Sequence, residues 1–261
     1  MHLLIDIGNS TVVAAIANDN GEIITTWRFD TIKNQTSDYY YDNLMSGLYT
    51  YCIKSGDIEN TAISSVVPEI NSRFTEVVQK ITGAEPRFFS VTDAEKLLDI
   101  DVDFPEQVGK DRLADAIAAA ECYGCPTIVI DMGTATTVGV VTSDRKFVGG
   151  MIIPGVKTSH RALCERASQL SKIDKWHAER IVGRNTKECM QSGVIYGAAC
   201  MIDGIIDRIN EMFGVKFNIV ATGGMLAIIV PYCKHQIVVD KYLLLKGIYY
   251  TVIASNKKSN E

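Results

Sequence analysis

The sequence predicts an α/β protein made of two similar domains with a cleft between them. Three observations predict this fold class. A segment at the N-terminus recurs almost half a chain later, and strand patterns alternate with helix patterns along both halves. The chain is also long enough for two domains, because 47% of its 261 residues are hydrophobic and can form buried cores.

The recurring segment is the strongest of these observations. Residues 3–13 read LLIDIGNSTVV, and residues 128–138 read IVIDMGTATTV. Asp, Gly, Thr and Val occur at the same offsets in both, so that Asp131 matches Asp6. Self-similarity of this kind indicates a duplicated structural unit.

Each copy continues as an antiparallel meander of strands. In the first half, the second and third strands are joined by a turn at 18–21, whose terminal Asn-Gly pair supplies the positive φ of a tight hairpin. The corresponding turn in the second half is 142–145. No low-complexity linker separates the halves, and we expect domains at residues 1–120 and 121–261.

The rest of each half alternates between helix and strand patterns. Asp38 can cap a helix that runs to about Ser55, and Pro68 suits the first turn of a helix at 69–81. The other expected helices are 110–122, 156–169, 186–213 and 242–254, and the other expected strands are 61–67, 86–90, 217–221 and 236–239.

Charge and composition exclude several classes of protein. The net charge of −5 argues against nucleic acid as the main partner, because binding to phosphate needs a clustered positive excess. No apolar run approaches the roughly 18 residues of a membrane span, and residues 1–5 are too short for the core of a signal peptide. The odd number of cysteines, seven, has no disulfide-framework spacing. We therefore expect a cytoplasmic protein.

The segment from Asp6 to Thr11 is the first candidate site. It lies in the turn between two strands, where glycine lets the backbone approach a ligand and successive N–H groups can form an anion nest. Asp6 could hold a divalent cation beside bound phosphates. An ordinary hairpin is the alternative, but the near-copy at 131–134 favours a pair of phosphate loops that bind ATP.

These paired loops resemble those of the superfamily of actin, Hsp70 and sugar kinases. The P-loop pattern and the Rossmann glycine pattern are both missing from the sequence. The resemblance implies duplicated RNase H-like (actin-like ATPase) domains with the nucleotide in the cleft between them.

The segment Gly109–Arg112 is the second candidate site. A helix is expected to begin at about Lys110, and Asp111 in its first turn lies near the positive end of the helix dipole, which favours the ionised carboxylate. Such a carboxylate can orient and deprotonate a substrate hydroxyl in phosphoryl transfer. The alternative is a capping Asp beside a surface Arg.

Taken together, the motifs resemble those of type III pantothenate kinases, which open coenzyme A synthesis in bacteria. They follow the family's order along essentially the whole chain, and their combination is more specific than any one of them. The matching segments are 6–11 (DIGNST), 64–68 (SSVVP), 109–112 (GKDR), 131–137 (DMGTATT), 149–150 (GG), 154–155 (PG), 183–186 (GRNT), 191–193 (QSG) and 221–224 (ATGG).

The resemblance implies a role for each motif. The first loop would bind the phosphates of ATP, with Asp6 near Mg²⁺, and Asp111 would be the general base that takes the proton from the primary hydroxyl of pantothenate. The implied ATP contacts are Asp6, Ile7, Gly8, Asn9, Ser10, Thr11, Val12, Val13 and Thr134, and the implied pantothenate contacts are Gly109, Lys110, Asp111, Arg112 and Thr186.

The resemblance also implies a further cofactor and a partner. Asp131 would coordinate a monovalent cation, K⁺ or NH₄⁺. Thr186 would contact pantothenate from a site built at the interface of a homodimer. The segment Thr222–Gly224 would lie at the adenosine end of the nucleotide. ATP and pantothenate are then the expected ligands, with no nucleic acid and no membrane as partner.

The chain departs from the family's usual pattern at three places. Val102 stands where a Tyr is usual, Asp115 stands where the helix after Gly109–Arg112 usually carries Asn, and 243–247 (LLLKG) replaces a segment that more often holds a Thr and a Glu. The histidines have no metal-ligand spacing, and we expect surface or capping roles for them.

Other activities remain open on the sequence alone. A sugar kinase of the same superfamily is one alternative, and a regulatory protein that kept the fold without the chemistry is another. A phosphatase of the exopolyphosphatase branch is a third. The segment at Gly109–Arg112 favours pantothenate over a sugar, and the intact Asp6, Asp111 and Asp131 argue against a protein without catalysis.

Overall fold

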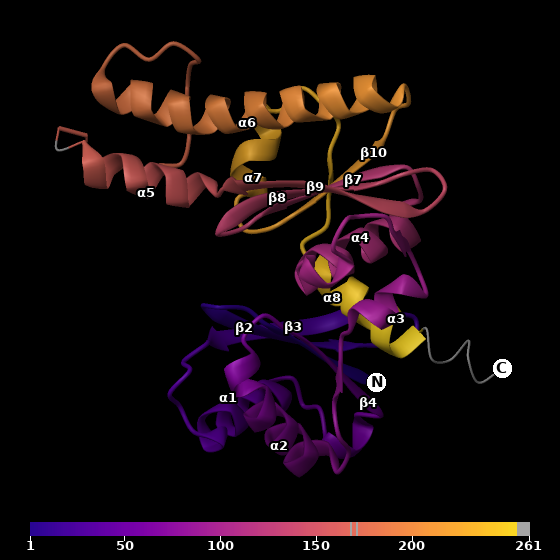
Figure 1. The fold of residues 1–261 in the computed structure, drawn as a ribbon. Coiled ribbons are helices and arrows are strands. Elements are labelled where there is room, and N and C mark those ends of the chain that lie inside the picture. The colour runs from indigo at the N-terminus through magenta and orange to yellow at the C-terminus, as the bar shows by residue number, and fades with distance from the viewer. Residues whose placement is uncertain (168, 171, 255–261) are drawn as a thin grey trace. The chain divides into compact units, whose positions relative to one another are not determined.

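The computed structural model describes residues 1–167, 169–170 and 172–254. The chain divides into two compact units. The first unit combines Met1–Glu121 with the segment from Tyr242 onward, and the second unit is Cys122–Lys241 (Figure 1). Each unit has its own sheet, its own helices and its own hydrophobic core.

The sheet of the first unit has the order β3-β2-β1-β4-β5. The first three strands form the expected antiparallel meander, and β4 and β5 then run parallel to β1. The strands are β1 (His2–Ile7), β2 (Thr11–Ala17), β3 (Ile23–Asp30), β4 (Asn60–Ser65) and β5 (Arg87–Phe88).

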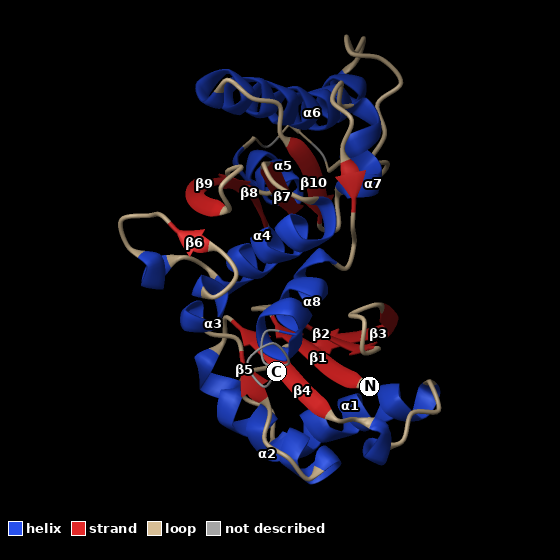
Figure 2. Ribbon diagram, turned by 90° about the vertical axis from the view of Figure 1, so that its right-hand side faces the viewer, coloured by secondary structure: helices blue, strands red, loops and turns tan. Residues whose placement is uncertain are grey.

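Helices cover both faces of this sheet (Figures 1 and 2). One face packs on α1 and α2 through a core that includes Leu3, Ile5, Tyr40 and Phe74. The other face receives α8, which contacts β1 and β4. The helices of this unit are α1 (Ser37–Thr50), α2 (Asn71–Thr82), α3 (Val91–Glu95), α4 (Lys110–Tyr123, which ends just inside the second unit) and α8 (Leu243–Ile248), the last continued by the π-helical η5 (Tyr249–Ala254).

The second unit repeats this architecture. Its strands have the order β9-β8-β7-β10-β11, again an antiparallel meander followed by two parallel strands. This is the strand order of RNase H-like domains, so the predicted duplication is confirmed. The elements are β7 (Thr127–Met132), β8 (Ala135–Val141), β9 (Lys146–Pro154), β10 (Asn218–Thr222), β11 (Val238–Val239), α5 (Val156–Arg166), α6 (Thr186–Phe213) and α7 (Leu226–Ile229); a short strand β6 (Asp99–Ile100) belongs to the first unit.

Helix α6 has the bounds that the sequence predicts because both of its ends are capped. The Asn185 side chain accepts a hydrogen bond from the Glu188 N–H at 3.0 Å, and Gly214 ends the helix in the left-handed conformation with φ 65°. Among the described residues, α6 is the one helix long and apolar enough to cross a membrane by length and composition. Its apolar face packs into the core of the second unit through Ile195, Ile202 and Ile206, as in a core helix.

The two copies of the repeat differ by one residue in their turns. Ile7 pairs with Val12 across the first turn, whereas Met132 pairs with Thr136 across the second. The second turn is therefore one residue shorter, and Thr136 is the structural counterpart of Val12. The sequence comparison assumed that the two copies match residue by residue, and this is wrong beyond the glycine. A shift of one residue in a strand exchanges the side chains that face the core with those that face away from it.

The slip leaves a hydroxyl group on the core face of β8. Thr136 is 1% exposed, and its Oγ1 has no hydrogen-bond partner in the described structure. Because a buried unpaired hydroxyl costs about 1–3 kcal/mol, we expect Thr136→Val to raise the free energy of unfolding by about 1 kcal/mol. Urea denaturation checks this, and Thr137→Val, at the half-buried next position, is the control. A destabilised Thr136→Val protein would contradict the expectation.

The closing helix belongs to the first unit and not, as the sequence division implied, to the second. A Cβ added at Gly247 would lie 2.0 Å from the carbonyl oxygen of Ala114, so α8 packs directly on the backbone of α4. The ring of Tyr249 packs on Gly21 in the hairpin between β2 and β3, and its hydroxyl donates a hydrogen bond to the Asp19 carbonyl. These contacts place α8 and η5 in the same unit as β1, β2 and β3.

Some local expectations need correction. Thr36, not Asp38, occupies the N-cap of α1, and this helix ends at Thr50. Helix α5 ends at Arg166, and residue 168 of its expected last turn lies outside the described residues.

The expectation of surface or capping roles for the histidines is wrong for His2 and His160, because both side chains are buried. The His2 Nε2 lies 2.9 Å from Asp19 Oδ1, and the His160 Nε2 accepts a hydrogen bond from the Ile173 N–H.

Candidate active site

The turn from Gly8 to Ser10 is closed by a hydrogen bond from the Gly8 N–H to the Thr11 carbonyl oxygen at 3.1 Å. Thr31 fixes two carbonyl groups of this turn. Its Oγ1 donates a hydrogen bond to Gly8 O at 2.7 Å, and its N–H donates one to Ser10 O at 3.1 Å. In the described part of the chain, the N–H groups of the exposed residues Asn9 and Ser10 make no hydrogen bond. Two adjacent N–H groups of this kind suit an anion.

Asp6 lies at the end of β1 and directly precedes this turn. It is half-buried, and it pairs in register with Val13 on β2 and with Ser64 on β4. Cross-strand partners point to the same face of a sheet, so Asp6 stands between a methyl-bearing and a hydroxyl-bearing side chain. The carboxylate and the N–H groups of the turn thus combine a cation ligand with an anion site.

The segment Gly109–Arg112 forms the start of α4, as the sequence predicts. The Asp111 carboxylate folds back over Gly109, where an added Cβ would lie 2.4 Å from Asp111 Oδ1. Its Oδ1 also accepts a hydrogen bond from the Arg112 N–H at 2.9 Å. A side chain at position 109 would therefore require the Asp111 carboxylate to move.

Arg112 is half-buried beside this carboxylate. Burial lowers the pKa of its guanidinium group, and the negative charge of Asp111 acts in the opposite direction. A partly buried guanidinium next to a carboxylate offers a planar set of donors of the kind that binds anions. The pair therefore places a carboxylate and a guanidinium group within one turn of helix.

Asp131 occupies the corresponding place at the end of β7. A Cβ added at Gly223 would lie 2.5 Å from Asp131 Oδ1 and 2.6 Å from the backbone of Met132, so the chain after β10 passes directly against the carboxylate. Gly223 has φ 105°, a conformation that other residues rarely adopt. The Gly133 backbone also lies close, at 3.6 Å from Asp131 Oδ2 when measured from an added Cβ.

Thr134 is held by the beginning of α5. Its carbonyl oxygen accepts hydrogen bonds from the Gly155 N–H at 3.1 Å and from Thr158 Oγ1 at 2.8 Å. The exposed side chain of Thr134 and its own N–H, which makes no hydrogen bond in the described part of the chain, remain available to a ligand.

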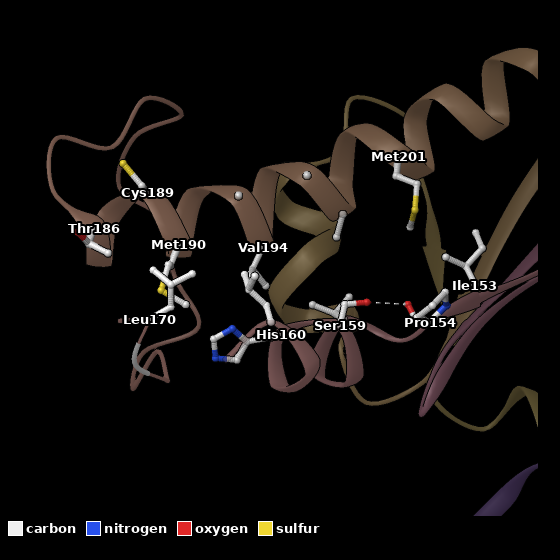
Figure 3. Close-up of a pocket in the computed structure, with 15 residues that line it drawn as sticks. Ile153, Pro154, Ser159, His160, Leu170, Thr186, Cys189, Met190, Val194 and Met201 are labelled. Atoms are coloured by element: carbon white, nitrogen blue, oxygen red, sulfur yellow. Dashed lines mark hydrogen bonds between the residues drawn. The ribbon is translucent and has the colours of Figure 1, made fainter. Parts of the chain in front are cut away.

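Thr186 lines a cavity of about 590 Å³ between α5 and α6. The walls are largely apolar, and Figure 3 shows Val194 of α6 facing His160 and Ser159 of α5. On the α6 side the wall is formed partly by Gly193 and Gly197, whose added Cβ atoms would meet nothing within 4 Å. Pro154 and Val156, which flank the contact to Thr134, line the other end.

The expected site residues thus form four groups in the structure: residues 6–13, residues 109–112, Asp131 with Thr134, and Thr186. Ser64 lies within one of the sequence motifs, but neither its place beside Asp6 nor the contact of Thr158 with Thr134 was predicted from the sequence. The position of Ser64 beside Asp6 could have been inferred from the parallel pairing of the first and fourth strands, which follows from the predicted fold.

Comparison with known proteins shows which family matches this chain. A model of the type III pantothenate kinase family matches residues 2–208. A type III pantothenate kinase of Dictyoglomus turgidum is 38% identical over 252 residues, covering 96% of this chain and 98% of that protein. One of Halalkalibacterium halodurans is 34% identical over 248 residues, covering 95% and 97%.

A solved structure supports the fold. A Baf family protein from Campylobacter jejuni superposes with a TM-score of 0.60 at 19% identity, covering 99% of this chain and 100% of that one. At this level of identity the likeness concerns the fold alone.

Proposed function

The chain belongs to the type III pantothenate kinase family, and from this premise we propose that it transfers the γ-phosphoryl group of ATP to pantothenate. The product is 4'-phosphopantothenate, formed in the first step of coenzyme A synthesis. The observation that carries the proposal is the match to the family across both units. It is supported by a turn after the strand aspartate in each unit, in which the N–H groups of Asn9 and Ser10 or of Thr134 make no hydrogen bond in the described part of the chain.

Asp111 is the general base in this proposal. The proton of the primary hydroxyl passes to its carboxylate, the hydroxyl oxygen bonds to the γ-phosphorus, and the bond from that phosphorus to the β,γ-bridging oxygen breaks to release ADP. The fold of the carboxylate over Gly109 supports this role, since it fixes the direction of the base. Arg112 supplies the positive charge for the pantothenate carboxylate.

The phosphates of ATP bind at the turn that follows Asp6 and at Thr134. Asn9 and Ser10 donate their N–H groups, and residues 6–13 form the walls of this subsite. A kinase that uses ATP needs a divalent cation such as Mg²⁺, and Asp6 is the carboxylate suited to hold it, directly or through water. Asp131, enclosed by Gly133 and Gly223, is suited to a monovalent cation, K⁺ or NH₄⁺.

Thr186 contacts pantothenate from the interface of a homodimer, and a second copy of the chain covers the cavity between α5 and α6. The apolar walls and the exposed Leu163 at this cavity support such a contact. Gly197→Glu, which meets no atom within 4 Å in the monomer, should then reduce the molar mass in sedimentation to that of one chain. We also propose a cytoplasmic location, as substrates and family imply.

A single assay tests the reaction. Pantothenate, ATP and Mg²⁺ are incubated with the protein in K⁺ buffer and in Na⁺ buffer, and the products are analysed by mass spectrometry. We expect a product heavier by one phosphate, formed in K⁺ and not in Na⁺. Equal turnover in both buffers would overturn the monovalent site but leave the kinase intact.

The remaining alternatives predict different outcomes of this assay. Folded protein that binds ATP and gives no product would indicate a regulatory protein. A phosphorylated sugar from a substrate panel would indicate a sugar kinase, and release of inorganic phosphate without any acceptor would indicate a phosphatase.

A further inference from the structure

A hydroxyl group without a hydrogen-bond partner lies at the end of β4, next to the first phosphate turn. Ser64 is 0% exposed, and its Oγ is buried without a partner in the described structure. Leaving such a group unpaired costs about 1–3 kcal/mol. The neighbouring Ser65, in contrast, accepts a hydrogen bond from the Val67 N–H at 3.1 Å. The lack of a hydrogen-bond partner is therefore specific to Ser64 and does not extend to the next serine of the strand.

The position of Ser64 is defined by its strand pairing. It is the parallel partner of Asp6, and both side chains lie on the face of the sheet opposite to the core formed with α1 and α2. The other neighbour of Asp6 in this row is Val13, which offers no polar group. Of the two residues that pair with Asp6 on the neighbouring strands, Ser64 is therefore the one with a hydroxyl group.

The second copy of the repeat has the same arrangement. Thr222, at the end of β10, is the parallel partner of Asp131. A hydroxyl-bearing residue therefore stands beside the loop aspartate in both units, although Ser64 and Thr222 lie in segments with little other similarity. Recurrence at equivalent places of a duplicated fold argues for a function tied to the aspartate.

We propose that Ser64 is a positioning residue, whose hydroxyl donates a hydrogen bond to the Asp6 carboxylate when that carboxylate engages the hydrated cation of MgATP. This inference rests on the proposed function of the Asp6 turn. Carboxylates that hold a cation are themselves oriented by hydrogen bonds, and loss of such an outer partner typically costs about 10–100-fold in cation affinity. The unpaired hydroxyl is the stability cost of keeping this donor in place.

The proposal makes stability and function change in opposite directions. In Ser64→Ala, loss of the unpaired hydroxyl should leave the melting temperature of the ligand-free protein equal or higher, by about 2 °C. The Mg²⁺ concentration that half-saturates the reaction should rise about tenfold. The same shift should appear without catalysis, in the Mg²⁺ dependence of thermal stabilisation by a non-hydrolysable ATP analogue.

Matched variants separate this role from a packing role. Ser64→Cys keeps the size of the side chain but donates only weakly, and it should resemble Ser64→Ala in its Mg²⁺ dependence. Ser64→Thr keeps the hydroxyl and should retain the Mg²⁺ affinity even though the extra methyl group lowers stability. Ser65→Ala loses a paired hydroxyl and should be less stable with unchanged Mg²⁺ dependence.

The outcomes of this experiment are distinguishable. A Ser64→Ala protein that is less stable and has the Mg²⁺ dependence of the wild type would overturn the proposal, because its hydroxyl would then be structural. Wild-type protein that fails to phosphorylate pantothenate would instead overturn the proposed function, while the analogue-binding measurement would still test Ser64.

Discussion

Asp111→Asn should fold as the wild type does and lose about 10²–10⁴-fold in kcat, because an amide cannot take the proton from the pantothenate hydroxyl. The substitution keeps the size of the side chain, and its carbonyl oxygen can still accept the hydrogen bond from the Arg112 N–H. Substrate binding should therefore persist. The measurement is the initial rate at saturating ATP and pantothenate, together with thermal stabilisation by each substrate.

The exposed Asp103 is a suitable control for this variant. Asp103→Asn removes one negative charge from the same unit, outside the helix that carries Asp111. It should change kcat by less than about twofold, since a surface charge in water has only a weak effect at a distance. Near-normal turnover by Asp111→Asn would refute its assignment as the base and leave Arg112 as the main catalytic candidate of that segment.

Gly223→Ala should lower the free energy of unfolding of the second unit by about 3 kcal/mol or more. The new methyl group would have to fit where Asp131 Oδ1 and the Met132 backbone lie within 2.6 Å, and it would do so at φ 105°. Backbone atoms cannot move aside as a flexible side chain can. The strain should also displace the Asp131 carboxylate and weaken any dependence of the activity on K⁺.

The adjacent Gly224 provides the matched control. An added Cβ there would meet nothing within 4 Å, so Gly224→Ala should change stability by less than about 1 kcal/mol. Both variants can be compared by urea denaturation followed by circular dichroism. If the two glycines tolerate alanine equally, the close passage of the backbone against Asp131 is not a constraint on the site.

Much of the fold could be predicted because its signals are local. The helix pattern at 186–213 predicted α6, whose ends Asn185 and Gly214 cap in the structure, the Asn20-Gly21 pair predicted a hairpin, and the repeated Asp-x-Gly segment predicted the duplication. Each of these signals depends on a backbone preference of the residues themselves, so one sequence is sufficient to detect it.

The remaining features depend on contacts between distant segments. The shorter turn after Met132 is set by strand pairing, and the match of Thr11 with Thr136 concealed it because both copies carry Thr at that offset. The burial of His2 depends on Asp19 and on Asn60, at a sequence distance that no periodicity reveals. Likewise, the place of Ser64 beside Asp6 follows from parallel pairing and not from spacing.

The return of the chain to the first unit has a consequence for its synthesis on the ribosome. Helix α8 and η5 are synthesised after the whole second unit, yet they pack in the unit whose sheet was made first. The second unit is continuous, so its sheet and core can form before α8 is made. The first unit therefore acquires the contacts of Gly247 and Tyr249 only after the second unit has been synthesised.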